Sequence, residues 1–132
     1  MILVDACVFM YAVGAPHPLK ERSLGWLDRA AAGEIEAAVD AEVLQEILHR
    51  YRALHRWKEG RVAYDLARRA VPLVVPLTAR ILDEARALLD RHPKIMARDA
   101  LHAAACRIHR AEGIASFDTD LDGIEGVLRI EP

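Results

Sequence analysis

Hydrophobic residues follow two patterns along this chain: short apolar runs, and longer stretches in which apolar residues recur every three or four positions. The short runs are bounded by turn-forming or charged residues, which is typical of buried strands. The predicted strands are 2–4, 37–39, 73–75, 114–117 and 127–130. The third lies between two prolines, which favours the edge of a sheet.

The longer stretches predict amphipathic helices. Their expected ranges are 19–32, 41–54, 58–69, 79–92 and 97–112. Asp40 and Thr78 stand where N-caps are expected, and Gly33 and Gly113 stand where helices should stop. Because strands and helices alternate, the sequence predicts an α/β fold with a mainly parallel sheet and helices on both faces.

In such a sheet the carboxyl ends of the strands meet along one edge, and ligands bind just outside it. Asp5 and Asp118 each follow a predicted strand directly. We therefore expect both carboxylates at that edge, and this placement is the first indication of function.

Composition narrows the possibilities. The 132 residues fit a single domain, expected to span 1–132, and the hydrophobic and charged fractions of 53% and 29% are those of a globular protein. A net charge of −2 excludes a global positive field, so a polyanion must meet a local basic patch.

Two cysteines cannot build a disulfide framework or a four-cysteine zinc site. With no signal peptide and no apolar run of about 20 residues, we expect a cytoplasmic protein with free thiols and no membrane contact.

Each candidate carboxylate has a structural alternative. Asp5 can cap a following helix, and Asp99 lies in a first helical turn, where the helix dipole favours an acid. Glu46 borders the apolar stripe of its helix, whereas Glu42 is expected to be a solvated charge.

Asp118, Asp120 and Asp122 form a D-x-D-x-D-G run that resembles the start of a calcium-binding EF-hand loop. The twelfth position of that loop is Arg129 instead of glutamate, and a strand precedes the run where a helix is required. The calcium hypothesis therefore fails.

Gathering several carboxylates at one edge requires a compensating charge. Two carboxylates about 5 Å apart repel by about 3 kcal/mol at an effective dielectric constant of about 20. Oxygen ligands favour Mg²⁺ or Mn²⁺ over zinc, and such ions activate water for phosphodiester hydrolysis.

A site built on histidines is the competing hypothesis to the carboxylate site. The pairs His49 with His55 and His102 with His109 lack the i, i+4 spacing of a helical zinc site, so surface or partly buried structural roles are expected. Nucleotide-binding glycine motifs and the GxSxG motif are absent from the sequence, which argues against those enzyme classes.

Four segments together resemble the PIN-domain family, and length and spacing resemble its VapC-type ribonuclease toxins most. They are ILVD at 2–5, AEVLQEIL at 41–48, RDALHAA at 98–104 and SFDTD at 116–120. The resemblance implies a compact three-layer α/β/α domain and an endoribonuclease that depends on Mg²⁺ or Mn²⁺. It also implies homodimers, an RNA substrate and a cognate antitoxin.

By position, the resemblance makes Asp5, Asp99 and Asp118 metal ligands, with Glu46 completing the catalytic pocket and Asp120 as a further acid. One departure concerns the two positions after the first aspartate. The family usually has hydroxyl or amide side chains there, and this chain has Ala6 and Cys7.

Two alternatives remain open. One is a PIN-like module that binds RNA or a protein without cutting. The other is a metal-dependent phosphatase with Asp5 as nucleophile, although Cys7 occupies the place of its second acid.

The helices 19–32 and 41–54 are expected to form the groove that binds the partner. The expected RNA path is the basic stretch of Arg50, Arg52, Arg56, Lys58 and Arg61, with Arg98, Arg107 and Arg110 as the alternative.

Overall fold

The computed structural model describes residues 1–132 and contains one five-stranded sheet. The strands are β1 (Ile2–Val4), β2 (Ala37–Asp40), β3 (Val74–Val75), β4 (Gly113–Ala115) and β5 (Arg129–Ile130). Their order is β3-β2-β1-β4-β5, and every neighbouring pair is parallel. The predicted parallel sheet is therefore confirmed, and β3 lies at its edge as its flanking prolines predicted.

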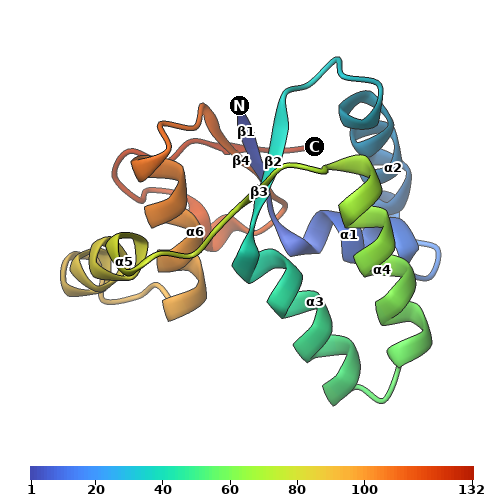
Figure 1. Ribbon diagram of the computed structural model, residues 1–132, viewed down its shortest axis with the longest axis horizontal. Coiled ribbons are helices and arrows are strands. Elements are labelled where there is room, and N and C mark those ends of the chain that lie inside the picture. Colours follow the sequence, from blue (N-terminus) through green and yellow to red (C-terminus); the bar gives the residue numbers. More distant parts are fainter.

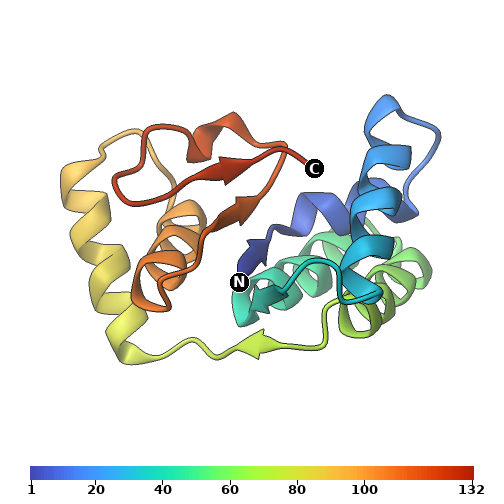
Figure 2. The same cartoon turned by 90° about the horizontal axis from the view of Figure 1, so that it is seen from above.

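Six α-helices and one 3₁₀ turn cover the sheet (Figure 1). They are α1 (Ala6–Val13), α2 (Pro18–Ala31), α3 (Ala41–Ala53), α4 (Trp57–Ala70), α5 (Ala79–Arg91), α6 (Ala97–Ile108) and η1 (Thr119–Leu121). Figures 1 and 2 show α5 and α6 on one side of the sheet and α1 to α4 on the other. None of these helices is long and apolar enough to cross a bilayer.

Alternation along the strands divides the core between the two sides. Val4, Val39 and Ala115 pack with the helices α1 to α4, whereas the preceding residue of each strand packs with α5 and α6. Successive side chains of a strand point to opposite faces, so each short strand contributes to both cores. The three-layer α/β/α sandwich predicted from the sequence is confirmed.

Helix α1 is the one helix that the hydrophobic pattern did not predict. Its sequence, ACVFMYAV, is apolar all round and therefore has no helical periodicity to detect. Val8 and Phe9 are fully buried, while Cys7, Met10 and Tyr11 reach the pocket described below. Burial on several sides explains why the segment lacks a polar face.

The expected helix 97–112 is too long, and Gly113 does not terminate it. The helix ends at Ile108, and the left-handed residue that follows is Arg110, with a φ of 51°. Gly113 instead begins β4, where an added Cβ would lie 2.4 Å from the Leu128 carbonyl oxygen. The glycine therefore permits close approach to β5. The other predicted stop, Gly33, has a φ of +77° just after α2, as expected.

Candidate metal centre

The strand order places a crevice at the carboxyl ends of β1 and β4. The chain runs from β1 outward through β2 to β3 and then returns to β4 on the other side of β1. Ligands in parallel α/β sheets bind at such a switch point. Asp5 follows β1, and Ser116 and Asp118 follow β4, so all three lie at this crevice.

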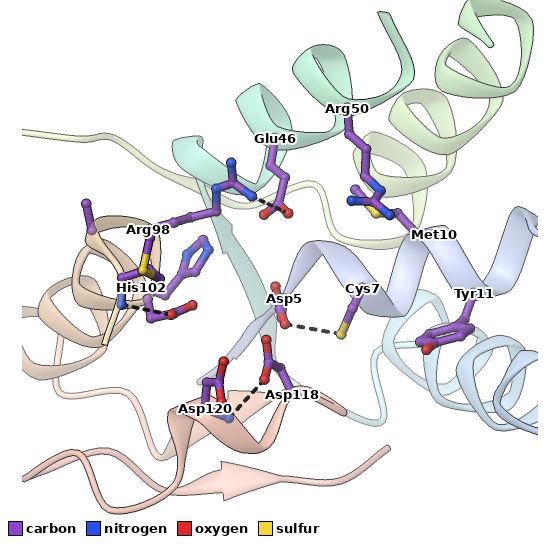
Figure 3. Close-up of a pocket in the computed structure, with 13 residues that line it drawn as sticks. Asp5, Cys7, Met10, Tyr11, Glu46, Arg50, Arg98, His102, Asp118 and Asp120 are labelled. Carbon is purple, nitrogen blue, oxygen red and sulfur yellow. Dashed lines mark hydrogen bonds and ion pairs between the residues drawn. The ribbon is translucent and has the colours of Figure 1, made fainter. Parts of the chain in front are cut away.

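A cavity of about 740 Å³ opens at this point. Figure 3 shows Asp5 near its middle, with Glu46 approaching from α3 and Asp118 from the opposite side. All five predicted acids line the cavity: Asp5, Glu46, Asp99, Asp118 and Asp120. The structure thus brings together the five acids that the family resemblance placed in the site.

Two donors hold the carboxylate of Asp5, which is buried. The Ser116 hydroxyl donates to Asp5 Oδ2 at 2.5 Å, and the Cys7 thiol donates to the same oxygen at 3.1 Å. Burial raises the pKa of Cys7 to about 12, so the group remains a thiol and a donor. Asp5 occupies the N-cap position of α1, yet its side chain accepts no backbone N–H of that helix. The capping alternative for Asp5 is therefore wrong.

Glu46 is half-buried and forms an ion pair with Arg98, with Nη1 and Oε1 2.7 Å apart. Burial raises the pKa of Glu46, Arg98 opposes that rise, and Asp5 adds to it. Arg98 Nε also lies 3.6 Å from Glu42. Glu42 is only 16% exposed, so its predicted role as a solvated charge is wrong.

Asp99 both stabilises the first turn of α6 and lines the cavity. Its Oδ2 accepts the Met96 backbone N–H at 3.3 Å, which is the first-turn role expected from the helix dipole. Burial raises the pKa of Asp99, the Met96 N–H lowers it, and the neighbouring Asp118 and Asp120 carboxylates raise it further. Asp118 caps η1 by accepting the Asp120 N–H at 2.9 Å.

The third acid of the D-x-D-x-D-G run points elsewhere. Asp122 forms two hydrogen bonds with the Arg129 guanidinium, at 2.7 and 3.1 Å, and does not line the cavity. The arginine at the twelfth position is thus the ion-pair partner of this acid. Asp122 therefore lies outside the cavity that Asp118 and Asp120 line.

His102 is the main residue that sequence reasoning missed. It is 3% exposed, and its Nδ1 lies 2.7 Å from Asp40 Oδ2, so the expectation of surface or partly buried histidines is wrong here. Burial lowers the pKa of His102, but Asp40, Asp5 and Glu46 outweigh burial and raise it to about 9. A signal was available: His102 follows Asp99 by three positions and shares its helix face.

The donor atoms suit a divalent cation. Asp5, Glu46 and His102 each offer one ligand atom, and these atoms lie within 4.8 Å of one another. His102 Nε2 is buried without a hydrogen-bond partner, and among the acids that line the cavity only Glu46 forms an ion pair, with Arg98. A cation of charge +2 would offset the repulsion among these carboxylates.

Comparison with known proteins agrees with this geometry. The PIN domain family matches residues 2–127. Ribonuclease VapC13 of Mycobacterium tuberculosis is 40% identical over 130 residues, covering 98% of this chain and 99% of the relative. Ribonuclease VapC23 of the same species is 37% identical over 121 residues, covering 92% and 95%.

Two solved structures share the fold. The FitAcB structure from Neisseria gonorrhoeae superposes with a TM-score of 0.72 at 22% identity, covering 99% of this chain and 97% of that one. A toxin–antitoxin complex from Klebsiella pneumoniae has a TM-score of 0.67 at 19% identity, with coverages of 97% and 96%.

The chain belongs to the PIN-domain family, with relatives among the VapC ribonucleases. PIN-domain nucleases are metal-dependent enzymes, and the acidic pocket of this chain is suited to a divalent metal. The predicted family and fold are therefore confirmed, and the relatives named here are ribonucleases, the enzyme class that the sequence predicted.

Proposed function

We propose that this chain cleaves RNA phosphodiesters in the pocket at the ends of β1 and β4, as the toxin of a toxin–antitoxin pair. One observation supports the assignment most strongly: acids from four separate segments converge on one cavity in which only Glu46 has a basic partner. A module that only bound RNA would gain nothing from this repulsion. We propose that residues 1–132 act as one domain.

The proposed metal ligands are Asp5, Asp99 and Asp118, with Glu46 completing the set and Asp120 at its margin. Their oxygen atoms favour Mg²⁺ or Mn²⁺. When bound, such an ion lowers the pKa of a water molecule and stabilises charge on the scissile phosphate.

The residues around the acids position them. Ser116, from the end of β4, and Cys7, from α1, hold Asp5 in one orientation. Arg98 holds Glu46 over the cavity, and Arg50 lines the same cavity with no acidic partner in the structure. Arg50 is thus the arginine best placed to meet a phosphate.

Mass analysis of the product ends tests the reaction type. Hydrolysis with metal-activated water leaves a 5′-phosphate and a 3′-hydroxyl and stops in excess chelator. A histidine-based ribonuclease instead directs the RNA 2′-hydroxyl onto the phosphate and leaves a cyclic phosphate. A cyclic phosphate that still forms in chelator would overturn the proposal.

For the partners, we propose a homodimer and an antitoxin that inserts an amphipathic helix into an apolar groove. The expected groove between 19–32 and 41–54 needs revision, because α4 packs against both α2 and α3. The exposed Leu48 and Leu54 of the α3 end now favour the α3 side, beside a shallow hollow that reaches Trp57. Light scattering showing a strict monomer at high concentration, with no co-purifying protein, would contradict this.

The two free thiols agree with the proposed cytoplasmic location.

A further inference from the structure

His102 has an unused ligand atom inside the pocket. Its ring is almost fully buried, and its Nε2 has no hydrogen-bond partner. Buried polar atoms are nearly always paired, because leaving one unpaired costs about 1–3 kcal/mol. A buried Nε2 facing a cavity lined by acids therefore points to a ligand.

The groups that face Nε2 are carboxylates. Asp5 from the end of β1 and Glu46 from α3 each place an oxygen within 4.8 Å of a ring nitrogen of His102 (Figure 3). A divalent cation binds nitrogen and oxygen ligands at about 2.0–2.2 Å, so opposite ligands lie about 4 Å apart. Small side-chain rotations are enough to bring these three atoms onto one ion.

Asp40 fixes the orientation of the histidine ring. Its Oδ2 lies 2.7 Å from His102 Nδ1, while its Oδ1 accepts the Val43 N–H at 3.1 Å as the N-cap of α3. A carboxylate can only accept, so Nδ1 carries the proton in this pair and Nε2 faces the cavity. Carboxylate–histidine–metal arrangements orient imidazole ligands in the same way.

We propose that His102 Nε2 is a direct ligand of the divalent cation, together with Asp5 and Glu46, and that Asp40 is the positioning residue for the ring. This inference rests on the proposed function, because it adds a nitrogen ligand to the same metal site. The cation takes the place of any proton on Nε2, and that proton leaves to solvent. Because imidazole suits transition ions better than Mg²⁺, the site should prefer Mn²⁺ to Mg²⁺.

Electron spin-echo spectroscopy of the Mn²⁺-loaded protein tests this directly, because it detects nitrogen bound to the ion. We expect a nitrogen coupling in the parent protein that disappears in His102→Asn. Asparagine can keep the hydrogen bond to Asp40 from the place of Nδ1 but has no atom at Nε2. His109→Asn changes an exposed histidine near the end of the same helix and should keep the coupling.

Calorimetry with Mn²⁺ and with Mg²⁺ gives a second readout. Loss of a ligand should weaken Mn²⁺ binding by about tenfold or more, and Mg²⁺ binding much less. Asp40→Asn should also weaken Mn²⁺ binding, by about 10–100-fold, because the ring loses its charged acceptor. If His102→Asn does not fold, parent protein labelled with the heavy nitrogen isotope at histidine decides, because His102 is the histidine that lines the cavity.

The outcomes separate this inference from the proposed function. If the parent binds Mn²⁺ without a nitrogen coupling, and Asp5→Asn abolishes that binding, His102 is a structural partner of Asp40 and the inference is overturned while the metal site stands. If the parent binds neither ion, or Asp5→Asn binds both as the parent does, the proposed metal site itself is overturned.

Discussion

Two side chains donate hydrogen bonds of different strength to the Asp5 carboxylate. The Ser116 hydroxyl is fully buried, lies 2.5 Å from the carboxylate and also accepts the Asp118 N–H at 2.9 Å. The Cys7 thiol lies 3.1 Å away and is a weaker donor. Ser116 therefore links Asp5 with Asp118, and Cys7 adds little to that link.

Replacing Asp5 with asparagine should abolish cleavage while preserving the fold. Asparagine has nearly the same shape but no charge, so the metal loses a ligand and the neighbouring acids lose a source of repulsion. Rates measured on a labelled RNA should fall to background, with a thermal unfolding midpoint at least as high as that of the parent. Asp65→Asn, at an exposed position on α4, is the matched control. Equal activity in Asp5→Asn and the parent would remove Asp5 from the site.

Ser116→Ala should reduce both stability and activity more than Cys7→Ala does. Losing a buried hydrogen bond to a carboxylate costs about 1–3 kcal/mol, whereas the thiol is a weak donor. Chemical denaturation gives the stabilities, and single-turnover cleavage gives the rates. A larger loss in Cys7→Ala would mean that the thiol, and not the hydroxyl, orients Asp5.

The helices α3 and α4 approach each other closely at Gly60. A Cβ added to Gly60 would lie 2.6 Å from the Tyr51 Cβ and 3.2 Å from an atom of the Trp57 ring. Tyr51 is buried, and its Cβ cannot move without moving α3. Because α3 also carries Glu46, this contact helps to fix the orientation of α3 relative to the pocket.

Gly60→Ala should destabilise the protein by about 1–3 kcal/mol, since overpacking a helix contact displaces backbone. Gly25→Ala is the matched change within α2, where an added Cβ meets nothing within 4 Å. There the better helix propensity of alanine should stabilise by about 0.5–1 kcal/mol. Two denaturation curves measure both values. A neutral Gly60→Ala would show that α3 and α4 can separate without cost.

The basic residues expected to bind RNA do not all face the acidic cavity, because several of them have other partners. The Arg52 guanidinium stacks over Trp57 at 4.9 Å, and Arg56 pairs with Glu59 at 3.3 Å. Arg50 is the member of the stretch that lines the acidic cavity. An RNA strand drawn into the cavity would therefore meet Arg50, near carboxylates from both halves of the sheet.

Arg50→Gln should weaken RNA binding and reduce its salt dependence by about one phosphate contact, a slope change of about 1. Titrations at several salt concentrations in the Asp5→Asn background measure this without cleavage. Arg61→Gln removes an exposed charge of the same stretch away from the cavity and should leave the slope nearly unchanged. If only Arg61→Gln lowers the slope, the RNA path follows the outer face of α4 instead.

Much of the fold was predictable because its signals are local. The caps Asp40 and Thr78 were predicted from their place before apolar stripes, and both side chains accept the expected N–H. Helix α1 was missed because a helix buried on several sides has no polar face. The role of Gly113 was wrong because the glycine serves an approach between strands, which no local pattern records.

The sequence by itself determined which acids meet. Asp5 and Asp118 follow strands, and parallel strands bring such positions to one edge whatever the details of packing. Asp99 starts a helix, and Glu46 borders the apolar stripe of α3. Only the tertiary structure decided what holds them. Ser116 reaches Asp5 across 111 positions and His102 reaches Asp40 across 62. Such contacts depend on the relative placement of α3, α6 and β4, which is set by core packing and leaves no periodic trace in the chain.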